Sequence, residues 1–294
     1  MFLFCVLICV SFIYSMLFIL LMAKYLQKTY YGNASKGKAV FLLVQHDGDP
    51  EKFVTSFPKI PNVLGLDPNT FHKYLKVERD LSSSALAHSI AKKLPFASVV
   101  EVTIPRGIVD ANRNPDCALP NVLDFSRSRV LRDELLGIQA EIHGEIAAAF
   151  SEFPSAVYLE MHTMASSPPS RTDYSDVPSY LDAWLNPKGV KRPVDLITFT
   201  PNGIAASNLR LAASALSVFS SLGEVVAFDF PYAASPHVKA VQYLMDHPCG
   251  LAMDIPKGIL ASGSSLDSLE VDSKKIERVA IAFANELKTF LACI

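Results

Sequence analysis

Short apolar runs alternate with longer amphipathic stretches from residue 39 to the end of the chain. Apolar runs that are rich in β-branched residues and bounded by turn residues are typical of buried strands. They predict strands over residues 39–45, 97–104, 157–164, 194–200, 224–230 and 250–255. Apolar residues at helical spacing predict helices over residues 80–94, 127–150, 205–222, 237–245 and 272–291. This alternation indicates an α/β fold, with a mostly parallel or mixed sheet covered by helices on both faces.

Three stretches lack such a period. Residues 50–68 begin and end with proline and are predicted to form a loop. Residues 166–189 are rich in Ser, Pro and Asp, and a loop of that length in a compact domain is usually functional or mobile. Residues 24–38 are polar, precede the first strand and are predicted to form a stalk.

The first 23 residues contain no charged side chain and are dominated by large apolar residues. A helix of that length can span a bilayer core of roughly 30 Å. A cleaved signal peptide is the alternative, but such a peptide normally has a basic start and a small-residue cleavage site, and neither is present. The expected organisation is a transmembrane anchor over 1–23, a polar stalk over 24–38 and one domain over 39–294, in a single-pass membrane protein.

Charge and cysteine usage indicate the expected side of the membrane and exclude some classes of protein. Four lysines and no acidic residue lie between residue 24 and Asp47, and the positive-inside rule then places the domain on the cytoplasmic side. The chain has a net charge of −2 and no basic patch, which argues against a nucleic-acid partner. Cys117, Cys249 and Cys293 are too few and too scattered for a disulfide framework.

Two histidines lie at the carboxyl ends of predicted strands. His46 follows the first strand, and His162 lies near the end of the third, two residues after a glutamate. Side chains at these strand ends emerge into a crevice in open α/β sheets. Imidazole and carboxylate are the ligands of catalytic zinc, so we predict a Zn²⁺ site whose third ligand is Asp49 or Asp80. The alternative is that both are hydrogen-bonded loop histidines.

Further polar residues are candidates for the chemistry. Arg106, Asn112 and Arg113 follow the second strand, and an arginine fork can bind a substrate carboxylate at two points. The alternative is a loop in which the arginines pair with neighbouring aspartates. Asp254, near the end of the last strand, is a candidate general base, although a turn-forming aspartate is common at such places. His237 is a candidate for the lining of the pocket.

These segments together resemble the N-formylglutamate amidohydrolase family, which is related in fold to zinc carboxypeptidases and aspartoacylases. The resemblance covers most of residues 40–260. Its most specific part is Arg106–Arg113, which matches the family's Arg-Leu-Val-Ile-Asp-x-Asn-Arg. The other matching segments are His46–Gly48, Glu78–Leu81, Glu160–Met164 and Met253–Ile255.

The resemblance implies a zinc-peptidase-like fold with His46 and His162 as zinc ligands, and it favours Asp80 over Asp49 as the third ligand. It also implies that the substrate carboxylate is held by Arg106, Asn112 and Arg113.

Three positions depart from the family pattern. Gln45 replaces a proline, Asp254 replaces a glutamate, and Pro256 replaces an arginine. The change at Asp254 bears directly on catalysis, because a misplacement of about 1 Å can cost on the order of 100-fold in rate.

The predicted function is therefore that of a membrane-anchored zinc hydrolase. It would cleave the amide of an acidic N-acyl amino acid of the N-formylglutamate type, with Asp254 taking a proton from the attacking water. One alternative is the trimming of a peptide's carboxyl-terminal residue. The other is a non-catalytic, membrane-tethered binding protein of the same fold, which the substitutions at Asp254 and Pro256 favour.

Overall fold

A computed structural model of the chain describes residues 25–33, 38–153 and 156–294. Its centre is a seven-stranded sheet in the order β1-β3-β2-β4-β7-β5-β6. The strands are β1 (Leu26–Gly32), β2 (Val40–Val44), β3 (Phe96–Val102), β4 (Val157–Met164), β5 (Val194–Ile197), β6 (Val226–Phe228) and β7 (Gly250–Pro256). The four strands from β3 to β7 in this order run parallel, whereas β1 and β5 run antiparallel to their neighbours β3 and β7. The predicted α/β fold with a mixed sheet is confirmed.

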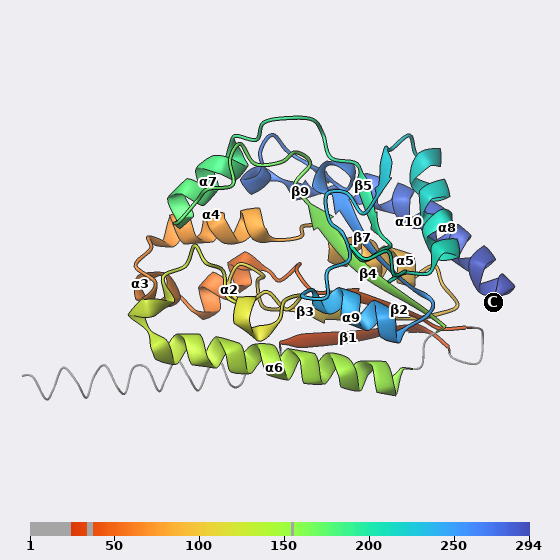
Figure 1. Cartoon of the computed structure of the whole chain (residues 1–294), viewed down its shortest axis with the longest axis horizontal. Helices are drawn as coiled ribbons and strands as arrows, with labels where there is room; N and C mark the ends of the chain where they lie inside the picture. The colour runs from red at the N-terminus through yellow and green to blue at the C-terminus, as the bar shows by residue number, and fades with distance from the viewer. Residues whose placement is uncertain (1–24, 34–37, 154–155) are drawn as a thin grey trace, which may run out of the picture.

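Helices cover both faces of the sheet (Figure 1). One buried apolar cluster joins the sheet to α5 (Ser83–Ala91), α8 (Leu209–Ser221) and α10 (Ser273–Cys293). The other joins it to α4 (Pro68–Glu78), α6 (Arg129–Glu152), α7 (Val177–Leu185) and α9 (Lys239–Asp246). Helix α6 illustrates why the helices pack on the sheet. Its apolar residues repeat at helical spacing and are buried along one face. They are Leu131, Leu135, Ile138, Ile142 and Ile146.

The prediction of a membrane-spanning helix is corrected. In the part of the chain that the structure describes, every helix is too short or too polar to cross a bilayer. The proposed anchor over residues 1–23 lies outside the described residues. The structure therefore gives no support for a single-pass membrane protein or for a membrane partner.

The predicted stalk is also corrected, because residues 26–32 form the edge strand β1. This strand pairs with β3 from Leu26 opposite Val102 to Gly32 opposite Phe96. Leu26 is buried, whereas the residues that follow it are half-buried or exposed. An edge strand with one solvated face lacks the continuous apolar run that marks a buried strand. The polar residues of β1 therefore did not predict a strand.

Both predicted loops contain helices. Residues 50–68 include α2 (Pro50–Ser56) and α3 (Ile60–Val63), and residues 166–189 include α7. In α2 and α4, an aspartate caps the helix and a proline takes the first helical position. In α7 the cap is Asp176, which forms a capping box with Ser179. Aspartate followed by proline marks turns and helix starts alike, so this pattern alone does not distinguish a loop from a short helix.

His143 makes stability depend on pH at the packing of α6 against α9. Its Nδ1 lies 2.8 Å from the hydroxyl of Tyr243. Burial and the charge of Lys239 lower the pKa of His143 to about 4, whereas an unfolded histidine titrates near about 6.5. The folded protein therefore holds His143 neutral. The contribution of neutral His143 to the free energy of unfolding is complete above pH ~6.5 and is lost as the pH falls toward ~4.

When the pH is lowered from 7.5 to 4.5, we expect the free energy of unfolding to fall by about 1–2 kcal/mol less in His143→Gln than in the wild type. This value allows for the partial exposure of the ring. Urea unfolding at both pH values measures the difference. The exposed His237→Gln is the matched control and should follow the wild type. An identical pH response in His143→Gln would show that this side chain is not the source.

Candidate metal and substrate site

His46, Asp80 and His162 come together at the carboxyl ends of β2 and β4. The chain leaves β2 for β3 on one side and returns to β4 on the other, and open α/β sheets bind ligands outside such switch points. His46 follows β2, His162 lies within β4, and Asp80 lies between α4 and α5. The backbone N–H of Asp80 donates to the carbonyl of His46 at 2.9 Å. The backbone itself therefore holds Asp80 beside the first histidine.

Gly48 allows the segment after β2 to pack closely against the segment after β3. A Cβ at this position would lie 2.5 Å from the carbonyl oxygen of Ile104 and 2.8 Å from the nitrogen of Pro105. Both neighbours are backbone atoms, so a larger residue would force the two segments apart. This contact brings the segment that carries Arg106 and Arg113 next to His46.

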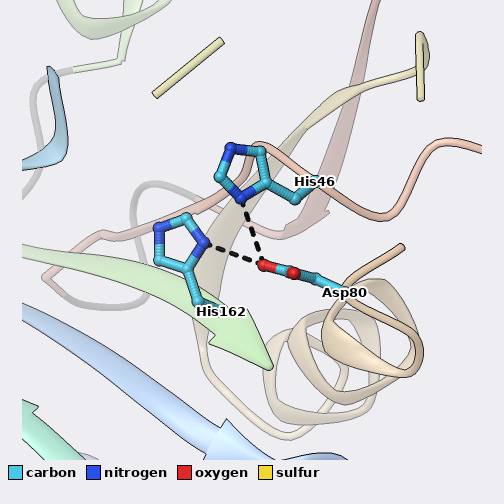
Figure 2. Close-up of side chains that lie close together, drawn as sticks. All are labelled: His46, Asp80 and His162. Atoms are coloured by element: carbon cyan, nitrogen blue, oxygen red, sulfur yellow. Dashed lines mark hydrogen bonds and ion pairs between the residues drawn. The ribbon is translucent and has the colours of Figure 1, made fainter. Parts of the chain in front are cut away.

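One nitrogen of each imidazole faces the same carboxylate oxygen, as Figure 2 shows. His46 Nδ1 lies 3.2 Å and His162 Nδ1 lies 3.0 Å from Asp80 Oδ2. The three side chains are buried, and one possible ligand atom of each lies within 4.8 Å of the other two. Two imidazole nitrogens and a carboxylate oxygen are a ligand set of catalytic zinc. The group could therefore hold a metal ion.

A further carboxylate lies on the far side of each imidazole. Asp110 Oδ1 lies 2.8 Å from His46 Nε2, and Glu160 Oε1 lies 3.1 Å from His162 Nε2. A metal-binding histidine commonly donates its other ring N–H to a carboxylate, which fixes the tautomer and the ring orientation. Both histidines have this arrangement, and it leaves both Nδ1 atoms facing Asp80.

Hydrogen bonds and charges within this cluster shift the pKa of Asp80 and that of His162. Burial alone raises the pKa of Asp80, but the charge of His46 and hydrogen bonds from both histidines hold the pKa of that carboxyl well below its usual range. Burial opposes protonation of His162, yet its bonds to Asp80 and Glu160 raise its pKa well above the usual value. The site thus stabilises positive charge beside Asp80, and a metal ion bound at His162 would displace a proton.

Two predicted site residues lie elsewhere. Asp49 is the N-cap of α2, and its carboxylate accepts hydrogen bonds from the backbone N–H groups of Glu51 and Lys52 at 2.9 and 3.3 Å. Its oxygen is thus committed to the helix start, and Asp80 takes the place beside the histidines. His237 is exposed in the segment before α9 and does not line the cavity, whereas its neighbours Ser235 and Val238 do.

A cavity of about 300 Å³ opens over the three residues and also contains Asp254. In the register of β4 and β7, Asp254 lies opposite His162. Burial raises the pKa of Asp254, and the charge of His162 opposes this rise. Within the described residues, its carboxylate makes no hydrogen bond or ion pair, so it is available to a ligand or to water.

The three predicted carboxylate contacts differ in availability. Arg106 already pairs with three acids, Glu78, Asp80 and Asp110, at 3.4–3.5 Å. Asn112 Oδ1 accepts a hydrogen bond from the backbone of α9 at 2.7 Å, and Asn112 Nδ2 lies 3.4 Å from His162 Nε2. Arg113 is the most exposed of the three, and among the described residues it forms an ion pair with one acid, Asp110, whose carboxylate lies 3.6 Å from its Nε. Arg113 is therefore the best placed of the three for a substrate.

Two further residues of this site, Glu160 and Lys257, had no role predicted from the sequence. The contact of Glu160 with His162 could have been predicted, because residues two apart on a strand share a face and Glu160 precedes His162 by two. No such pattern indicated Lys257. It is buried, lines the cavity and donates from Nζ to the carbonyl of Val77 at 3.0 Å. Lys257 thus brings a basic side chain to the cavity. It lies one residue after Pro256, and Pro256 is the position at which the resembled family has arginine.

No protein-family model matches the chain, and no curated protein matches it. Solved structures do share its fold. A gene product from Agrobacterium tumefaciens matches with a TM-score of 0.59 at 16% identity, over 91% of this chain and 96% of its own. N-formylglutamate amidohydrolase from Ralstonia eutropha JMP134 matches with a TM-score of 0.56 at 13% identity, over 91% of this chain and 99% of its own.

At these identities the likeness shows the fold alone. The resemblance stated from the sequence is confirmed at that level: the chain has a fold found in an amidohydrolase of the N-formylglutamate type. Whether it shares the activity depends on its own residues.

Proposed function

We propose that the protein is a metal-dependent hydrolase that cleaves the amide of a small N-acyl amino acid. The observation that carries the proposal is the convergence of His46, Asp80 and His162 in one cavity with Asp254, whose carboxylate has no hydrogen-bond or ion-pair partner among the described residues. The shared fold with an N-formylglutamate amidohydrolase supports the reaction class. The size of the cavity, about 300 Å³, suits a small substrate better than a long peptide.

Each group in the cavity has a role in this reaction. When bound by the two histidines and Asp80, zinc supplies a Lewis acid that polarises a carbonyl and lowers the pKa of water. Arg113 holds the substrate carboxylate and so orients the amide. Asp254 accepts the proton of the attacking water and passes it to the leaving nitrogen, because a carboxyl whose pKa burial raises is a better base near neutral pH. The C–N bond breaks, and the products are a carboxylic acid and a free amino acid.

A test of the proposal combines metal analysis with an activity screen. The full chain is purified, its metal content is measured, and it is incubated with N-formyl, N-acetyl and longer N-acyl derivatives of acidic and neutral amino acids. We expect one metal per chain and release of the free amino acid, which a chelator stops and added zinc restores. Retention of full activity after complete metal removal would contradict the metal dependence.

Arg113 is expected to bind the substrate carboxylate through its planar fork. Arg113→Lys keeps the charge and loses the fork, so KM for an N-acyl amino acid should rise about 10-fold or more with a smaller change in kcat. Steady-state kinetics measures this split. Arg129→Lys, at an exposed position on α6, is the matched control. An unchanged KM in Arg113→Lys would remove this residue from the binding site.

A further inference from the structure

Residues 229–235, which follow β6, form one wall of the cavity and are called the wall loop below. Four of them line the cavity: Pro231, Tyr232, Ala233 and Ser235. Backbone hydrogen bonds attach the wall loop to β5 and to the segment after β5 at two points. The N–H of Asp229 donates to the carbonyl of Leu196, and the N–H of Ala234 donates to that of Phe199, both at 3.1 Å. The residues between these points include Pro231 and Tyr232.

Between the two points, a single carboxylate supports the wall loop. The backbone N–H of Phe230 donates to one oxygen of Asp195 and that of Tyr232 donates to the other, both at 2.9 Å. Pro231, which lies between them, has no N–H to donate. Asp195 is buried in β5, so its position is set by the sheet. Because each oxygen accepts one hydrogen bond, the wall loop is held on both sides of Pro231.

The charge of Asp195 matters for this contact. Burial, together with the charges of Asp254 and Asp229, raises the pKa of Asp195 to about 6, and the hydrogen bonds from Tyr232 and Phe230 oppose the rise. The carboxyl group is therefore ionised at pH ~7.5, where both of its oxygens are acceptors.

Tyr232 connects the wall loop to two further residues of the cavity lining, Arg192 and Trp184. A terminal nitrogen of Arg192 donates to the hydroxyl of Tyr232 at 3.3 Å. The guanidinium carbon lies 5.8 Å from the ring centre of Tyr232 and 5.7 Å from that of Trp184. A displacement of Tyr232 would thus remove one of the two ring contacts of Arg192 and change the surroundings of Trp184.

We infer that Asp195 is a positioning residue of the cavity: its carboxylate fixes the wall formed by Pro231 and Tyr232 and, through Tyr232, keeps Arg192 beside Trp184. Asp195 is not among the residues that line the cavity, so it acts through the residues that it holds. The consequence for substrate affinity rests on the proposed function, whereas the position of the wall does not.

The place of Asp195 in the sheet offers a different explanation for any effect of its replacement. In the register of β5 and β7, Asp195 lies opposite Asp254. Like charges on facing strands disfavour each other, so the loss of one charge alters the other group. An effect through Asp254 alone would change kcat and leave Trp184 as it is. An effect through the wall loop changes the surroundings of Trp184 and raises KM.

Trp184 is the single tryptophan of the chain, so its fluorescence reports on the wall without a substrate. Asp195→Asn keeps the size of the side chain but has one acceptor oxygen, which leaves one N–H of the wall loop without its partner. In the full chain, treated with a chelator at pH ~7.5, we expect the constant for acrylamide quenching of Trp184 to rise about 2-fold or more.

Asp195→Ala, which has no acceptor, should raise the quenching constant further. Circular dichroism shows whether each variant folds, and Asp195→Asn decides the outcome if Asp195→Ala does not. In the metal-loaded protein, Asp195→Asn should raise KM for an N-acyl amino acid about 3- to 10-fold and change kcat by less than about 3-fold.

Asp229→Asn is the matched control. Asp229 begins the same loop, but its carboxylate accepts hydrogen bonds from the backbone N–H groups of Thr198 and Phe199. Its φ of 55° is a conformation that asparagine also adopts. The quenching of Trp184 in Asp229→Asn should therefore stay close to that of the wild type. Equal quenching in Asp229→Asn and Asp195→Asn would show that the loop responds as a whole, and the specific role of Asp195 would fall.

The remaining outcomes separate this inference from the proposed function. A changed kcat in Asp195→Asn with unchanged quenching of Trp184 would assign Asp195 to the base and overturn the inference. If the metal-loaded protein hydrolyses no N-acyl amino acid but Trp184 responds to Asp195→Asn, the hydrolase proposal falls and the positioning role stands. If hydrolysis occurs and Trp184 does not respond, the positioning role falls and the hydrolase proposal stands.

Discussion

Asp254→Asn is expected to lower kcat on an N-acyl amino acid by at least about 100-fold while the metal content stays unchanged. The reason is chemical, because an amide has almost the same size as the carboxylate but cannot accept the proton of the attacking water. Asp254 lies opposite His162 in the sheet register but is not among the residues that converge on the metal position. Steady-state kinetics together with metal analysis of the same preparation measures both quantities.

Asp254→Glu restores the side-chain length of the family that the sequence resembles, so it should keep or raise the rate. Asp246→Asn, at the exposed end of α9, is the control for the loss of one negative charge. If the protein is instead a binding protein of the same fold, the wild type has no turnover and neither change at Asp254 has an effect. Full activity of Asp254→Asn would refute its role as the base.

His162→Ala is expected to lower zinc affinity by at least about 100-fold, because it removes one of the three side chains proposed to hold the metal and leaves Glu160 buried beside a void. Competition with a chromogenic chelator measures the affinity. Circular dichroism and urea unfolding show whether the variant still folds, since Asp80 also loses a hydrogen-bond donor. Activity should fall with the metal content.

His237→Ala serves as the control for His162→Ala. His237 was a candidate pocket residue from the sequence, but it is exposed and lies outside the cavity lining. Its replacement should leave zinc affinity and kcat unchanged. One tightly held zinc per chain in His162→Ala would show that the metal position is misassigned.

The candidate site could be predicted from the sequence where the signal is local. His46 and His162 stand out because a polar residue ends an apolar strand, and strand ends of this kind meet at one edge of a sheet. No local sequence pattern distinguished Asp49 from Asp80 as the third ligand, since both aspartates follow the first strand and either could approach His46. The choice between them needed the family resemblance, and the structure shows Asp49 used as a helix cap.

The arginines show the limit of such prediction. Arg106 and Arg113 carry the same charge in one short segment, yet Arg106 is surrounded by acids and Arg113 is largely available. Two of the acids beside Arg106 come from the end of α4 and the segment after it.

The sequence by itself determined the kind and order of most elements, since the apolar period of a strand or helix is a local property of the chain. It also determined which strand ends carry histidine. Only the tertiary structure decided the partner of each charged group, because the residues that meet are far apart in the chain, as His46 and Asp110 are. It likewise placed residues 26–32 in the sheet, since an edge strand depends on its neighbour for hydrogen bonds and not on its own apolar pattern.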